Sequence, residues 1–283
     1  VSELRNVKLN SLIIRLKVMN NNKTEEVRST VNKESWISRY SIFVGRINAV
    51  PIYINFSFAF VFILITWTLS STILPNNYPG LVQSIYIIMG IVCAFISLFS
   101  ILLHELGHSI VASKYGIKFQ RIVLFALGGI ALNPNEITDP KKEIRMAFGG
   151  PSISFIISGI SLLLWFIFFE SRVFISQNSP IGWILFYSGV INLVIGLFNL
   201  LPLFPSDGGR ILRSFLSYYT HDHFKATKAA IKIGMIISIC ILIIGLAIGL
   251  RISFVSGLWL MFVAFFLMRA SKLNYNQYQD LFS

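Results

Sequence analysis

Two histidines four residues apart mark the most distinctive chemistry in the sequence. The segment LLHELGHSIVASKYG contains His104, Glu105 and His108. On a helix, residues at this spacing project from the same face, so the two imidazoles can chelate one Zn²⁺ while Glu105 acts on water that the metal activates. The segment closes an apolar run, where ionisable groups cost about 2.5–3.5 kcal/mol each and are usually functional. The alternative is a pair of interfacial histidines that cap a helix.

A catalytic zinc site needs a third protein ligand and an open fourth position for water. Glu105 and Asp207 are the two acidic residues that lie in or against apolar segments without an obvious surface role. Asp207 stands in FNLLPLFPSDGGRIL, where two prolines break the helix and a glycine pair permits a tight backbone. We therefore predict Asp207 as the third ligand. The alternative is an N-cap for a helix from Gly208 or Gly209 to Tyr219.

The composition indicates that these residues belong to a membrane protein. Of the 283 residues, 55% are hydrophobic and 13% are charged, about half the charged share of a soluble domain. The mean hydropathy is +0.71. These values exclude a disordered chain and argue against a soluble globule, because too few charged residues remain to cover one.

The apolar runs predict an α-helical polytopic membrane protein with about six transmembrane helices and short membrane-associated β-strands. About 20 apolar residues are needed to cross the hydrocarbon. We expect a polar cytoplasmic tail at 1–40 and a membrane-embedded domain at 41–283. Strand pairs are expected at 41–56 and at 117–132, the second around Gly128-Gly129. The expected spans are 53–74, 81–103, 151–169, 181–201, 233–250 and 252–268.

The basic residues predict the orientation of these spans. The net charge is +12, and 22 of the 24 Lys and Arg residues lie in the two tails and in every second connection. This asymmetry fits six spans with both termini in the cytoplasm. Both motifs then lie at the cytoplasmic end of their spans, so we expect the active site near that side. The basic excess is topological, with some contact to membrane lipids, and nucleic-acid binding is not expected.

These motifs resemble those of the site-2 proteases, a family of intramembrane zinc metalloproteases. The resemblance covers roughly residues 41–270 and depends on HELGH at 104–108, NLLPLFPSDGG at 199–209 and FGGP at 148–151. The segments IFVGRINAVPIYIN and ALGGIAL are similar to strand segments of the family. The six-span layout resembles the archaeal and bacterial branch, without the CBS pair or PDZ insert that some members have. Some members also have Asn where this chain has Ser154.

The resemblance implies a zinc metalloendopeptidase with one Zn²⁺ per chain, held by His104, His108 and Asp207, with Glu105 as the general base. It also implies that Asn199 helps to hold the substrate or the oxyanion, although an Asn late in a helix can simply bond to backbone. The implied substrates are single-span membrane proteins already trimmed by another protease.

A helical substrate must unwind locally, because its carbonyls are otherwise engaged in its own backbone bonds. An exposed strand edge at 122–132, including Gly128 and Gly129, is the candidate to bind the unwound segment by strand addition. The alternative there is a hairpin that only fills the bundle.

Two other functions remain open at this point. A metal transporter could use the same three ligands in transit, although transporters usually show internal repeats and polar positions along a pathway, and none is visible. A catalytically silent homologue that binds membrane proteins is the second alternative. The presence of all three ligands and of Glu105 argues against it.

Overall fold

Long helices and one small sheet make up the part of the chain that the computed structural model describes. The described residues are 40–47, 50–117, 121–125, 128–132, 139–170, 179–204 and 206–282. The predicted tail at 1–40 lies outside this set except for Tyr40.

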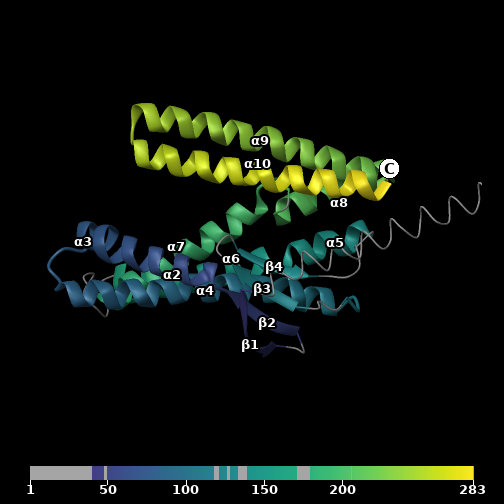
Figure 1. The fold of residues 1–283 in the computed structure, drawn as a ribbon. Helices are drawn as coiled ribbons and strands as arrows, with labels where there is room; N and C mark the ends of the chain where they lie inside the picture. Colours follow the sequence, from purple (N-terminus) through teal and green to yellow (C-terminus); the bar gives the residue numbers. More distant parts are fainter. Residues whose placement is uncertain are drawn as a thin grey trace, which may run out of the picture.

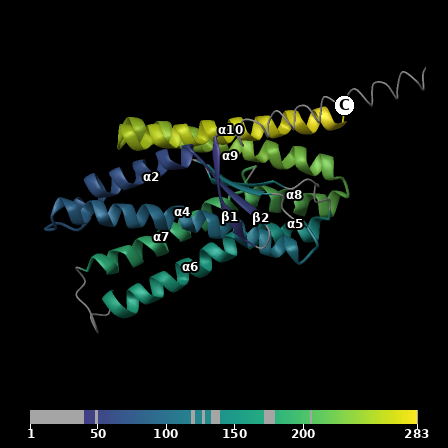
Figure 2. The same ribbon diagram turned by 60° about the horizontal axis from the view of Figure 1, so that its bottom comes forward.

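The helical segments follow the apolar runs of the sequence, with shorter helices at their ends. In chain order they are α2 (Ser57–Thr68), η1 (Leu69–Ile73), α3 (Leu74–Asn77), α4 (Gln83–Ser113), α5 (Pro140–Ala147), α6 (Gly149–Trp165), η2 (Phe166–Glu170), α7 (Pro180–Leu200), α8 (Asp207–Thr220), α9 (His223–Arg251) and α10 (Phe254–Phe282). Helix α4 packs against α2, α6 and α7. Helices α9 and α10 lie side by side, apart from the layer that contains α2 and α4 (Figures 1 and 2).

Four strands form a single sheet in the order β1-β2-β3-β4. These strands are β1 (Ser41–Ile47), β2 (Val50–Asn55), β3 (Arg121–Phe125) and β4 (Gly128–Leu132). The outer pairs are antiparallel hairpins, and β2 runs parallel to β3. Both predicted strand pairs are therefore confirmed. Gly128 and Gly129 do not form the turn, however: they pair with Phe125 and Leu124 and open strand β4.

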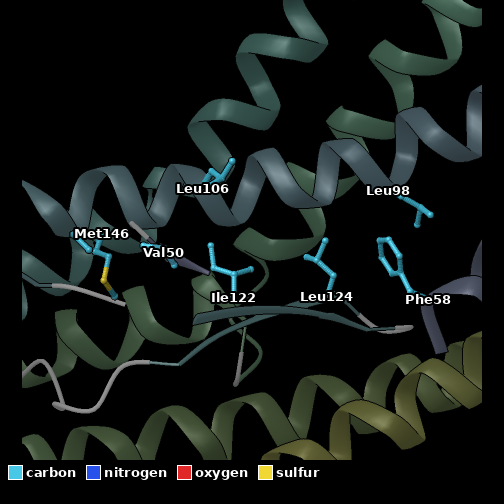
Figure 3. Close-up of a cluster of buried hydrophobic side chains, with 8 residues drawn as sticks. Val50, Phe58, Leu98, Leu106, Ile122, Leu124 and Met146 are labelled. Carbon is cyan, nitrogen blue, oxygen red and sulfur yellow. The ribbon is translucent and has the colours of Figure 1, made fainter. Parts of the chain in front are cut away.

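The sheet packs on the half of α4 that contains the HELGH motif. Ile122 and Leu124 of β3 point toward this helix and form a buried cluster with Leu98 and Leu106 of α4 (Figure 3). Val50, Phe58, Ala112 and Met146 complete the cluster. Burial of each large apolar side chain contributes about 1.5–3 kcal/mol, so this cluster fixes the sheet and the motif helix relative to each other.

The outer surface of the helices is apolar, as expected where the solvent is lipid. Five helical segments among the described residues are long and apolar enough to span a membrane: Ser57–Asn77, Gln83–Ser113, Pro140–Phe168, Pro180–Leu200 and His223–Arg251. Large apolar side chains such as Phe60, Trp67 and Phe95 are 62–70% exposed. Soluble proteins rarely expose such continuous apolar surface.

The expected spans agree with the helices except at some boundaries. The first was predicted from residue 53, but Tyr53–Asn55 belong to β2, and the helix begins at Ser57. The Oδ1 of Asn55 accepts a hydrogen bond from the Ser57 backbone N–H at 3.0 Å, which separates strand from helix. The sixth predicted span, 252–268, begins two residues before α10, which packs against α9. Helix α10 is not one of the five spans found among the described residues, so the sixth span stays a prediction.

Helices α4 and α6 cross at a pair of glycines. A Cβ on Gly149 would lie 2.6 Å from the carbonyl oxygen of Gly107, the glycine of the HELGH motif. No side chain fits between the two backbones, so this crossing sets how closely α6 approaches the histidines.

The glycine crossing predicts the effect of added methyl groups. We expect Gly149→Ala to lower the free energy of unfolding by about 1–3 kcal/mol, because the methyl group overpacks the crossing. Thermal unfolding in detergent measures this change. Gly159→Ala is the matched control in the same helix, since nothing lies within 4 Å of its Cβ position. Equal stability of the two variants would contradict a tight crossing.

Candidate metal centre

The two histidines and the distant aspartate meet inside the helical bundle. The Nε2 atoms of His104 and His108 each lie 3.1 Å from Oδ2 of Asp207. The three residues are 3%, 3% and 6% exposed, respectively. They form a group whose ligand atoms all lie within 4.8 Å of one another. The predicted meeting of HELGH with the Pro-Ser-Asp-Gly-Gly segment is therefore confirmed.

This donor set fits zinc. Two imidazole nitrogens and one carboxylate oxygen are typical ligands of a catalytic zinc site, which leaves the fourth position open. Tetrahedral coordination with bonds of ~2.0–2.1 Å would place ligand atoms about 3.3 Å apart. The observed nitrogen-to-oxygen separations are close to this value, so little movement is needed to accommodate the ion.

Each histidine is held by its second ring nitrogen. Nδ1 of His104 lies 3.0 Å from Oγ of Ser154 on α6. Nδ1 of His108 lies 2.8 Å from the carbonyl oxygen of Met146 on α5. A carbonyl only accepts, so Nδ1 of His108 donates, which leaves the lone pair of Nε2 directed at the metal position. Gly150 N–H also approaches this Nδ1, at 3.3 Å, but the shorter contact to Met146 determines the tautomer.

Glycines let the backbone come close to the ligands. A Cβ on Gly150 would collide with Nε2 of both histidines. At the start of α8, Gly208 lies against the carbonyls of Leu200 and Leu201, where a side chain would also collide. The predicted tight backbone at the glycine pair after Asp207 is thus confirmed. It allows the start of α8 to pack directly on the end of α7.

Asp207 is the first residue of α8, and Ser206 occupies the N-cap position. The N-cap alternative for Asp207 is therefore wrong. Burial raises the pKa of the Asp207 carboxyl, but the adjacent imidazoles of His108 and His104 outweigh burial, and the pKa lies well below its usual range. The carboxylate is ionised at neutral pH, as a metal ligand requires.

The remaining predicted residues occupy different places. Glu105 is half-buried on α4, between the two histidines in sequence and more exposed than either. The side-chain amide of Asn199 donates to the carbonyl of Ile195 in its own helix at 2.9 Å, so its role toward substrate stays a prediction. Gly128 and Gly129 lie in β4, at one edge of the sheet.

Several residues around the ligands were not predicted as functional. Met146 acts through its backbone carbonyl, which no side-chain pattern reveals. Ser154 stands at a position where some site-2 proteases have Asn, and its hydroxyl contacts His104. Glu143 and Arg213 form a buried ion pair between α5 and α8. Their separation of seventy residues gives no local signal.

Comparison with known proteins identifies the family. The model of peptidase family M50 matches residues 92–178 and 174–244, together more than half of the chain. Rip3 of Mycobacterium tuberculosis is 32% identical over 234 residues, which cover 83% of this chain and 58% of Rip3. Zinc metalloprotease MJ0392 of Methanocaldococcus jannaschii is 38% identical over 208 residues, which cover 73% of this chain and 54% of that protein. The chain thus spans somewhat more than half the length of these relatives.

The solved structure of a site-2 protease from Methanocaldococcus jannaschii is similar to this fold. Its TM-score is 0.54 at 30% sequence identity, and the match covers 83% of this chain and 94% of that chain. The chain belongs to peptidase family M50, the family of the site-2 proteases, and the resemblance found in the sequence is confirmed.

The contact between Ser154 and His104 predicts a loss of metal affinity on mutation. We expect Ser154→Ala to weaken zinc binding about 10- to 100-fold, because the imidazole of His104 loses the group that orients it. Competition with a chelating dye measures the affinity. Ser158→Ala is the control, since Ser158 lies one turn further along α6 and is also buried. A wild-type affinity in Ser154→Ala would show that the hydroxyl does not orient the ligand.

Proposed function

We propose that this chain is an intramembrane zinc endopeptidase that cleaves the transmembrane segments of single-span membrane proteins. The observation that supports it most strongly is the convergence of His104, His108 and Asp207 next to Glu105 within a bundle of apolar helices. The names of the relatives are in agreement, since MJ0392 is named a zinc metalloprotease.

In this proposal the three converging residues hold one zinc ion per chain. When bound, zinc lowers the pKa of water to about 7 and polarises the carbonyl of the scissile peptide bond. Glu105 takes a proton from the attacking water and passes it to the leaving amide nitrogen. Ser154 and the Met146 carbonyl keep the imidazoles oriented while this occurs. Glu105 is less buried than the three ligands, which is the arrangement that access for substrate and water requires.

The charge distribution supports an orientation with the site near the cytoplasmic side. Helix α4 ends shortly after HELGH, and α7 ends shortly before Asp207. Basic residues are concentrated in the connections on that side of the membrane, which by the positive-inside rule is the cytoplasm. With α10 counted as a sixth span, both termini are cytoplasmic, and the apolar outer surface contacts membrane lipids.

The edge position of β4 supports a role in holding substrate. An unwound segment of substrate exposes backbone N–H and C=O groups, which are costly in lipid unless they are paired. Addition of the segment to the edge of the sheet would supply these partners. Strand β4 follows β3, which packs on the HELGH helix through Ile122 and Leu124. The opposite edge of the sheet is β1.

The proposed base predicts a specific loss of turnover. We expect Glu105→Gln to lower the rate of cleavage at least about 10²-fold, because the amide cannot accept the proton. The measurement is cleavage of a single-span membrane protein co-reconstituted with the enzyme in vesicles. The variant should still retain the intact substrate on co-purification. Cleavage at the wild-type rate would rule out Glu105 as the base.

The proposed strand addition predicts that the two edges of the sheet differ. Gly129→Pro removes an N–H donor from β4 and should slow cleavage about tenfold or more while leaving zinc bound. Val44→Pro is the control on β1, at the position where the register shifts, and a bulge tolerates proline. Cleavage and metal content of both variants are measured together. Slow cleavage in Val44→Pro alone would place the substrate on the other edge, and joint loss of zinc and cleavage in Gly129→Pro would indicate misfolding.

A further inference from the structure

A buried carboxylate joins two helices that each lead to the metal position. Glu143 of α5 is 1% exposed, and Arg213 and Ser214 of α8 are 6% and 0% exposed. The guanidinium of Arg213 donates from Nη2 to Oε1 of Glu143, and the hydroxyl of Ser214 donates to Oε2. Two adjacent residues of α8 thus bind both oxygens of the Glu143 carboxylate.

The buried cluster of Glu143, Arg213 and Ser214 restricts the position of α8 relative to α5. A buried charge is tolerated only when it is paired and hydrogen-bonded, and removal of one partner leaves the other charge uncompensated. One N–H of the Arg213 guanidinium and the hydroxyl of Ser214 bind the two carboxylate oxygens from different directions. Helix α8 therefore cannot slide or rotate against α5 without breaking at least one of these bonds.

Helix α5 leads directly to one histidine. Met146 lies one turn after Glu143, and its carbonyl accepts the hydrogen bond from Nδ1 of His108. Displacement of α5 would therefore move the group that orients this imidazole. Arg145, between these two residues in sequence, faces away and donates to the hydroxyl of Tyr115.

Helix α8 leads to the aspartate. Asp207 is its first residue, and Ser214 lies two turns further along the same helix. The guanidinium of Arg213 also lies 5.3 Å from the ring centroid of Phe204, in the segment that precedes Asp207. Arg213 thus contacts both α5 and the approach to the carboxylate.

We propose that Glu143, Arg213 and Ser214 form a clamp that sets the position of the Asp207 carboxylate relative to His108, and with it the affinity and geometry of the metal site. The three are positioning residues, since none of them lies among the ligand atoms. The inference rests on the proposed zinc site and adds the device that holds its two halves together.

The test is the metal affinity and coordination of clamp variants of the full chain in detergent. Zinc affinity is measured by competition with a chelating dye, and coordination by the visible absorption of the Co²⁺-loaded protein, whose intensity reports tetrahedral geometry. We expect Glu143→Gln and Arg213→Gln to weaken zinc binding about tenfold or more and to lower the Co²⁺ absorption. Ser214→Ala leaves no buried charge unpaired, so it should fold and show a smaller change in the same direction.

Two controls separate positioning from general stability. Tyr86→Phe removes a buried hydroxyl that donates to the Tyr78 carbonyl at the far end of α4, and should lower the melting temperature without affecting zinc affinity. Arg145→Gln removes an exposed charge from α5 itself and should change neither the melting temperature nor the zinc affinity. The melting temperature of each zinc-free variant is recorded alongside its affinity.

The outcomes distinguish the clamp from the function it serves. The proposal is supported if the clamp variants bind zinc more weakly and show altered Co²⁺ absorption, while both controls keep the wild-type zinc affinity and Co²⁺ absorption. Wild-type zinc affinity in Glu143→Gln and Ser214→Ala overturns it, as does an equal loss of affinity in Tyr86→Phe. A wild-type protein that binds zinc but cleaves nothing overturns the proposed function and leaves the clamp intact. A wild-type protein that binds no metal overturns both.

Discussion

The close approach of three helices around two imidazoles is the constraint on which the rest of the structure depends. Polar groups enclosed by apolar helices must find partners within the protein, because lipid offers none. His104 and His108 find them in Ser154, the Met146 carbonyl and Asp207. These partners are within reach because α6 crosses α4 at a pair of glycines, and because the glycines at the start of α8 let it pack closely on the end of α7. The glycines of HELGH, FGGP and SDGG are thus as necessary to the site as its ligands.

The same constraint explains why short elements accompany the long helices. The sheet packs on the motif half of α4 and has β4 as one of its edge strands, while α5 and α8 hold the two sides of the site together. A bundle of long helices alone would have no exposed backbone at this depth and no device to fix an aspartate that is distant in sequence. The small elements hold the residues of the site in place, and the long apolar helices surround it.

Much of this arrangement follows from local sequence patterns. The spacing of His104 and His108 and the lengths of the apolar runs are local properties, so the helices and the ligand pair could be predicted. Asp207 followed from topology, because alternate spans end on the same side of the membrane. The first helix boundary was missed because Tyr53–Asn55 of β2 run into α2 as one uncharged apolar stretch, and hydropathy does not separate strand from helix there. The Glu143–Arg213 pair was missed because charged residues outside the spans look like ordinary surface residues until tertiary structure buries them.

Elemental analysis of the purified protein tests whether His104, His108 and Asp207 together hold a metal ion. Wild type, Asp207→Ala and Glu105→Gln are compared after identical purification in detergent. We expect about one zinc per chain in wild type and in Glu105→Gln, and loss of the zinc in Asp207→Ala, because two imidazoles alone do not complete a catalytic site. Absence of zinc from wild type after incubation with the metal, or full retention in Asp207→Ala, would contradict this expectation.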